Sequence, residues 1–177
     1  MFISRSKRYR STTSAVSSIT ELLLAEGAEA VLLRAAATAH PSETGGLLLG
    51  PRSSQRPWVT HVLEIPSTRP SPAHYVLPAG LTHPLIACAR RGDRRLGYLG
   101  EWHVHPVDTG PSRTDGRTMR RLASHAPNPP ILLLARLAPG GYALEVHVWS
   151  GVRHHQLSII RSGDLPGDPR TCSRRAT

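Results

Sequence analysis

Cysteine is scarce in this chain, whose 177 residues include only Cys88 and Cys172. Two cysteines so far apart provide neither a disulfide framework nor a pair at metal-ligand spacing. Cys88 lies in a segment with helical periodicity, where a small buried residue is expected, so it is not a candidate nucleophile. This use of cysteine favours a reducing, cytoplasmic setting.

Aromatic residues make up only 5% of the chain, and no apolar run approaches the roughly 20 residues of a membrane-spanning helix. The core is therefore expected to consist of Leu, Val, Ile and Ala, and no membrane partner is expected. The length suits one domain rather than two. Residues 1–20 contain no acidic residue and no apolar segment of the secretory type. We interpret 1–20 as a basic disordered arm, 21–160 as the domain and 161–177 as a flexible tail.

Acidic residues are outnumbered by basic ones, 12 to 22, which gives a formal net charge of +10. Residues 1–20 carry four basic and no acidic side chains, and residues 161–177 carry four basic and two acidic ones. The tails therefore hold +6, and the remaining +4 on the body is ordinary for a folded domain. Because no aromatic platform is interleaved with the basic stretches, a nucleic-acid module ranks last among the functional hypotheses, and no nucleic-acid partner is expected.

The order of periodic segments predicts the fold class. Segments with helical spacing alternate with short apolar runs of strand type, and a loop with four prolines over 66–78 interrupts them. This order predicts an α/β domain with a mixed, mostly antiparallel sheet flanked by helices. We expect helices over 19–37, 81–91 and 112–126, and strands over 45–50, 58–65, 96–104, 131–137, 142–149 and 152–160.

Two histidines stand one residue apart in the run Glu-Trp-His-Val-His-Pro at 101–106. Side chains alternate along a strand, so His103 and His105 point to the same side and can converge on one metal ion. Asp115, three residues after a candidate helix N-cap at Ser112, can turn its carboxylate back toward that ion. Each piece alone is common, since Ser-x-x-Asp is ordinarily a capping box. Together they predict three protein ligands and an open position, the arrangement of catalytic zinc.

A catalytic zinc site also needs a proton acceptor, and two glutamates are candidates. Glu43 lies far upstream, just before a glycine pair and an apolar strand. Glu101 lies two residues before His103, on the same side of the predicted strand, and is either a rival base or a partner that orients an imidazole. The remaining histidines have no supporting constellation and are interpreted as surface or half-buried side chains: His40, His61, His74, His83, His125, His147, His154 and His155.

At these residues the chain resembles the JAMM metalloproteases, whose pattern is a distant Glu, then His-x-His-Pro, a loop and Ser-x-x-Asp. The segment 97–106 is most similar to bacterial stand-alone members, including those of antiphage islands that carry ubiquitin-like conjugation enzymes. The loop between the second His and the Ser is one residue shorter than the usual loop of the family. The residues that match the pattern are Glu43, His103, His105, Pro106, Ser112 and Asp115.

The resemblance implies a JAB/MPN-like domain with Zn²⁺ held by His103, His105 and Asp115. It also favours Glu43 over Glu101 as the general base that activates a water molecule. Ser112 can cap the following helix or donate a hydrogen bond to the oxyanion, and the resemblance favours the second duty without excluding the first.

The expected activity is that of a zinc isopeptidase or peptidase acting at the C-terminus of a ubiquitin-like protein, in deconjugation or maturation. Expected partners are the ubiquitin-like protein or its conjugate and E1-like or E2-like conjugation enzymes. One alternative is release of sulfur or an amino acid from a sulfur-carrier adduct at the same site. The other is a non-catalytic MPN-type scaffold, against which the intact ligand set argues.

Overall fold

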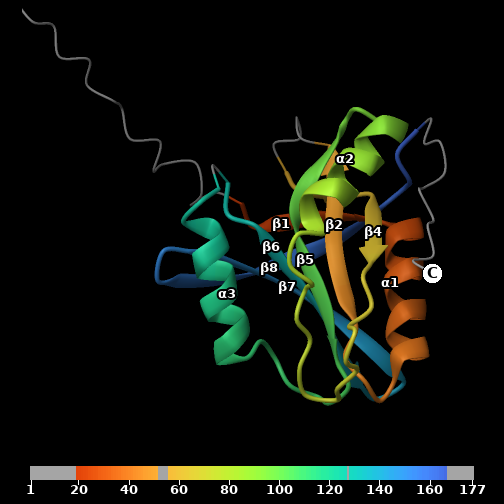
Figure 1. Ribbon diagram of the computed structural model, residues 1–177, viewed down its shortest axis with the longest axis vertical. Coiled ribbons are helices and arrows are strands. Elements are labelled where there is room, and N and C mark those ends of the chain that lie inside the picture. Colours follow the sequence, from red (N-terminus) through yellow and green to blue (C-terminus); the bar gives the residue numbers. More distant parts are fainter. Residues whose placement is uncertain (1–18, 52–55, 127, 167–177) are drawn as a thin grey trace, which may run out of the picture.

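An eight-stranded sheet and three helices account for most of the residues that the computed structural model describes, which are 19–51, 56–126 and 128–166 (Figure 1). In chain order the elements are β1 (Glu21–Ala25), α1 (Glu26–Ala39), β2 (Gly45–Pro51), β3 (Trp58–Val59), β4 (His61–Glu64), α2 (Thr82–Gly92), β5 (Leu96–His105), α3 (Arg113–Ala123), β6 (Ile131–Ala138), β7 (Gly141–Ser150) and β8 (Arg153–Ser162).

The strands lie in the order β3-β1-β8-β7-β6-β5-β2-β4. Four neighbouring pairs are antiparallel: β7 with β6 and with β8, and β2 with β4 and with β5. Three pairs are parallel: β5 with β6, and β1 with β3 and with β8. The prediction of an α/β domain with a mixed, mostly antiparallel sheet is therefore confirmed.

One face of the sheet packs against α1. Alternate residues of the central strands, among them Trp102 and Val104 of β5 and Leu133 of β6, are fully buried in one cluster with Leu32 of α1. Since side chains alternate along a strand, the residues between them, His103 included, project from the opposite face. This alternation decides which face of the sheet carries the candidate ligands.

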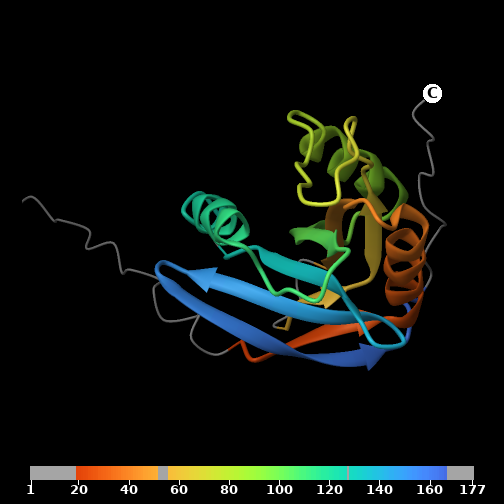
Figure 2. The ribbon, with the colours of Figure 1, turned by 90° about the horizontal axis from the view of Figure 1, so that it is seen from below.

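The opposite face is covered by two separate helices. On one part, Leu85 and Ile86 of α2 pack against Leu47 and Leu49 of β2. On the other part, α3 packs through Met119 against Leu132 of β6 and Trp149 of β7. Figure 2 shows α3 lying over the strands β6 to β8, apart from α2. The end of β5, with its two histidines, lies on this face.

The sequence-based prediction of one helix over 19–37 is wrong in its first seven residues, 19–25. Residues Glu21–Ala25 form β1, which inserts between β3 and β8 and pairs with both in parallel. Leu22 and Leu24 are fully buried, and Leu23 between them is only partly buried, as expected of a strand. The helical spacing holds only from Glu26 onward, where α1 begins.

No helix in the described part of the chain is long and apolar enough to cross a membrane. The basic arm lies almost entirely outside the described residues, as do 167–177 of the C-terminal tail with Cys172.

Candidate active site

The two histidines of β5 meet at their ring nitrogens. His103 and His105 are 8% and 7% exposed, and their Nε2 atoms lie 3.1 Å apart. Their rings are tilted by 41° with centroids separated by 4.9 Å. Two ligands bound to a tetrahedral zinc at about 2.0–2.2 Å lie roughly 3.3–3.6 Å from each other. The two nitrogens are therefore already close to the separation that one shared ion requires.

Asp115 joins the histidines from the first turn of α3. Its backbone N–H donates to Ser112 Oγ at 3.1 Å, and its Oδ2 accepts from the Ser112 N–H at 2.6 Å, which completes a capping box. Its Oδ1 lies 3.5 Å from His103 Nε2, and its Oδ2 lies 3.7 Å from His105 Nε2. The ligand atoms of all three residues lie within 4.8 Å of one another. Two imidazole nitrogens and one carboxylate fit zinc in a three-ligand site.

The charge state of Asp115 suits a metal ligand. Burial raises its pKa, but the hydrogen bond and the charge of His103, together with the bonds to Ser112, outweigh burial and hold the pKa well below its ordinary value. The helix N-terminus also favours a negative charge at this position. Asp115 is therefore an ionised carboxylate between two imidazoles.

The orientation of His105 is fixed by the loop that follows β5. Its Nδ1 lies 3.0 Å from the carbonyl oxygen of Thr109 and 3.3 Å from Thr109 Oγ1. A carbonyl oxygen can only accept, so Nδ1 carries the proton and Nε2 presents its lone pair toward His103 and Asp115. A hydrogen bond of this kind to the distal ring nitrogen is the usual support for a metal-bound histidine.

Glu43 lies beside the ligands because β2 runs antiparallel to β5. Gly45 pairs with His103, and the Val104 N–H donates to Thr44 O at 2.9 Å. Continued by two residues, this antiparallel register puts Glu43 opposite His105. The side chain is buried, with the residue 9% exposed. Burial raises the pKa of Glu43, the charges of His103 and His105 lower it, and the charge of Asp115 raises it again, with a net increase.

Glu101 lies on the same face of β5, two residues before His103. Burial raises its pKa, and the charge of His103 and the Tyr98 hydroxyl, 3.5 Å from Glu101 Oε1, lower it in part. Among the three ligands only His103 acts on the pKa of Glu101, whereas all three act on that of Glu43. Glu43 is thus the better placed of the two glutamates to exchange a proton with a group held by the ligands.

A pocket of about 310 Å³ opens directly beside His103 and Asp115. One wall is the segment 74–79, which belongs to the proline-rich connection after β4, and another is the face of α3 that carries Thr114 and Met119. Glu101 lines the pocket as well. The space for a ligand therefore adjoins the three candidate metal ligands.

The comparison with protein families decides the relationship of this chain. The family described as prokaryotic homologues of the JAB domain matches residues 25–152. The chain belongs to this family. Its membership confirms the predicted JAMM/MPN relationship, and the family contains zinc metalloproteases as well as inactive members.

A solved structure shows the same fold. The solution structure of protein DSY2949 from Desulfitobacterium hafniense aligns with a TM-score of 0.66 and 24% sequence identity, over 82% of this chain and 95% of that one. At this identity the likeness supports the JAB-domain fold and nothing further. No curated protein is similar enough in sequence to match the chain.

Several polar residues around the JAB-domain site escaped the sequence analysis. Tyr75 comes from the proline-rich loop, where no periodicity signals its position, and its ring is inclined by 26° to that of His103 with a centroid distance of 6.4 Å. The interpretation of His147 as a surface or half-buried histidine is wrong, whereas His154 is exposed, as that interpretation predicted. His147 is 3% exposed, and its Nδ1 lies 3.0 Å from His154 Nε2. The contact could have been predicted from the two-residue turn between β7 and β8, because this turn places His147 and His154 diagonally across the hairpin.

Proposed function

We propose that this JAB-domain protein is a zinc-dependent isopeptidase or peptidase that cleaves an amide or isopeptide bond at the C-terminus of a ubiquitin-like protein. The observation that carries the proposal is the meeting of His103, His105 and Asp115 at one point, with the buried carboxyl of Glu43 beside them. A scaffold needs neither a ligand set of this kind nor a base with a raised pKa next to it.

In this proposal each residue of the site has a defined duty. Zinc held by His103, His105 and Asp115 would supply Lewis acidity and would lower the pKa of a water molecule toward neutral pH. Glu43 takes a proton from the attacking water and passes it to the leaving amine. The hydroxyl of Ser112 already accepts from the Asp115 N–H, and its own proton remains available for the substrate carbonyl oxygen as negative charge develops there. One residue therefore serves both as the helix cap and as the oxyanion donor.

The substrate is proposed from the likeness of segment 97–106 to bacterial enzymes that act beside ubiquitin-like conjugation systems. The pocket next to His103 and Asp115 provides the space for the polypeptide on one side of the scissile bond. The partners in this proposal are the ubiquitin-like protein or its conjugate and E1-like or E2-like conjugation enzymes, in the cytoplasm. Release of sulfur or an amino acid from a sulfur-carrier adduct would use the same residues.

The test combines metal analysis with hydrolysis of two probes. Freshly purified protein is assayed for zinc, and then for release of coumarin from ubiquitin and from a short Gly-Gly peptide, each carrying a C-terminal coumarin amide. About one zinc per chain and turnover that the His103→Ala variant lacks are expected. A Gly-Gly peptide with a C-terminal cysteine tests the sulfur-carrier alternative. Release of cysteine in preference to coumarin would favour that alternative. Folded protein without zinc would refute the proposal, and zinc without any hydrolysis would favour the scaffold.

A further inference from the structure

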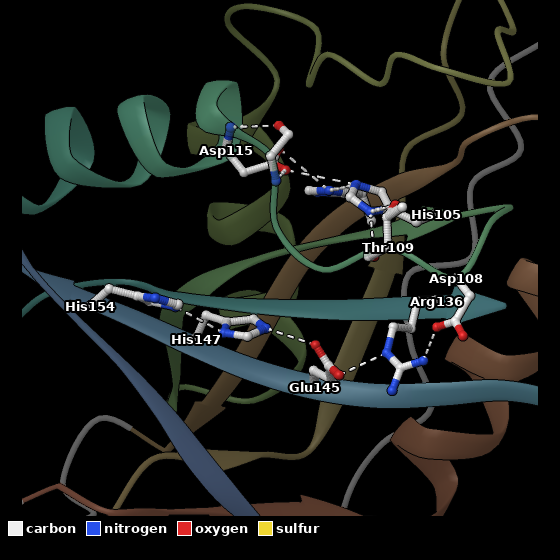
Figure 3. Close-up of polar contacts among 10 residues, drawn as sticks. His105, Asp108, Thr109, Asp115, Arg136, Glu145, His147 and His154 are labelled. Atoms are coloured by element: carbon white, nitrogen blue, oxygen red, sulfur yellow. Dashed lines mark hydrogen bonds and ion pairs between the residues drawn. The ribbon is translucent and has the colours of Figure 1, made fainter. Parts of the chain in front are cut away.

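Arg136 is the register partner of His105 on the neighbouring parallel strand β6. Partners in a parallel pair project from the same face, so Arg136 is on the face of the candidate metal site. Its guanidinium makes an ion pair with Asp108, which lies in the loop that leaves β5 (Figure 3). The residue after Asp108 is Thr109, whose carbonyl oxygen accepts from His105 Nδ1. The ion pair of Arg136 with Asp108 thus anchors the loop one residue before Thr109, whose carbonyl oxygen orients the candidate ligand His105.

The guanidinium of Arg136 is itself held from the other side. Its Nε donates to Glu145 Oε1 at 2.7 Å, across the β6–β7 pair. Glu145 Oε2 lies 3.3 Å from His147 Nε2, and His147 Nδ1 lies 3.0 Å from His154 Nε2. Figure 3 shows the resulting polar chain from Asp108 to His154, which runs below the ligands. Arg136 therefore has a fixed position from which to hold the loop.

The carboxylates also compensate the charge of Arg136. A cation on the face of the metal site opposes the binding of a second cation through electrostatic repulsion. Burial raises the pKa of Glu145, but the hydrogen bond and charge of Arg136 more than offset it and keep Glu145 ionised. With Asp108 on one side and Glu145 on the other, two carboxylates more than balance the single positive charge of the guanidinium.

We propose that Arg136 and Asp108 are positioning residues for the metal centre, which hold the 106–111 loop so that Thr109 presents its carbonyl oxygen to His105 Nδ1. The inference rests on the proposed function, because it assumes that His105 binds a metal ion. Residues 106–111 alone join β5 to Ser112, and the ion pair of Asp108 with Arg136 anchors this segment beside the residue that contacts His105.

Metal affinity separates this role from a contribution to folding alone. Asp108 is 65% exposed, and an ion pair with such a partner contributes little to stability. Loss of a group that supports a ligand typically weakens metal binding by 10–100-fold. We expect Asp108→Asn and Arg136→Gln each to weaken zinc binding by about 10–100-fold, measured by competition with a chromophoric chelator. The double variant should bind no more weakly than Arg136→Gln, because the two residues act as one unit.

A spectroscopic measurement and a matched control complete the experiment. Cobalt(II) in place of zinc should give a visible spectrum that differs between wild type and both variants, because His105 is held differently. Arg161→Gln is the control, since Arg161 is also an arginine paired with a carboxylate, that of Glu29 at 2.8 Å, but on β8 and α1. It should leave zinc affinity and the cobalt spectrum unchanged.

The outcomes distinguish this inference from the proposed function. If wild-type protein binds zinc and both Asp108→Asn and Arg136→Gln bind it within twofold of wild type, the positioning role is refuted and the metal centre stands. If wild-type protein binds no zinc, the proposed function itself fails. Asp108→Asn changes an exposed loop residue, so it gives a folded protein even if Arg136→Gln does not.

Discussion

Gly45 of β2 lies directly across from His103 of β5, and the ring of Tyr75 fills the space where a side chain at Gly45 would lie. A Cβ at Gly45 would be 2.5 Å from Tyr75 Cε1 and 2.5 Å from the carbonyl oxygen of Trp102. Tyr75 in turn lies against the ring of His103 and donates its hydroxyl to Ile65 O at 2.8 Å. The absence of a side chain at Gly45 thus permits the packing around the first histidine.

We expect Gly45→Ala to destabilise the protein, because the Trp102 carbonyl is backbone and cannot yield, and Tyr75 must move. Overpacking of this kind costs about 1–3 kcal/mol in the free energy of unfolding. Urea denaturation measures it, with Gly163→Ala as the control, since a Cβ at Gly163 meets nothing within 4 Å. Equal stability of the two variants would contradict this account of the glycine.

Glu43→Gln should separate catalysis from metal binding. The amide keeps the shape of the side chain but cannot take a proton, so turnover should fall by roughly 10²–10⁴-fold while zinc content stays at its wild-type level. Glu101→Gln is the matched variant on the same face of the sheet and should retain most activity. Turnover of a peptide coumarin amide and zinc analysis on both variants test the assignment. An inactive Glu101→Gln with an active Glu43→Gln would transfer the proton shuttle to Glu101.

Ser112 and Asp115 share a capping box but should differ in their effect on zinc. Ser112→Ala should lower the free energy of unfolding by about 1 kcal/mol, as expected for loss of an N-cap, and leave the metal bound. Loss of its hydroxyl as an oxyanion donor should also reduce turnover by roughly 10²–10³-fold. Asp115→Ala should lose the cap and the zinc together. Zinc retained at wild-type affinity by Asp115→Ala would remove this residue from the ligand set.

The stability of the protein should depend on His147 below neutral pH. Burial lowers the pKa of His147 below its ordinary value of 6.5, and the neighbouring His154 lowers it further, against the opposing effect of Glu145. The unfolded chain therefore binds a proton near pH 6.5 that the folded chain does not, and this contribution to stability is lost as pH falls through 6.5 toward the folded-state pKa. His147→Gln should show a smaller loss between pH 7.5 and 5.5 in urea denaturation. An unchanged pH dependence would show that His147 titrates alike in both states.

The grouping of the three candidate ligands follows from rules that involve only residues close together in the sequence. Alternation along β5 brings His103 and His105 together, and the three-residue spacing of the capping box turns Asp115 toward them. Both depend on neighbours within a few positions. Glu43 is different, because its place depends on the register of β2 against β5, and sequence analysis preferred it over Glu101 only through the family pattern.

What sequence analysis missed depends on pairing between distant segments. Leu22 and Leu24 suit either a helix or a strand, and only the parallel edges offered by β3 and β8 make Glu21–Ala25 a strand. The contact of Arg136 with Asp108 likewise needs the register of β6 beside β5. The local periodicity of these segments does not indicate which strands they pair with.

The double duty of Asp115 affects how relatives of this chain should be compared. Its carboxylate closes the capping box of α3 and also faces the two histidines, so selection for a stable helix alone is enough to keep an acidic residue there. A relative without hydrolytic activity could lack His103 and His105 and still retain Asp115. Among homologues, the two histidines therefore indicate a metal site, and the aspartate by itself does not.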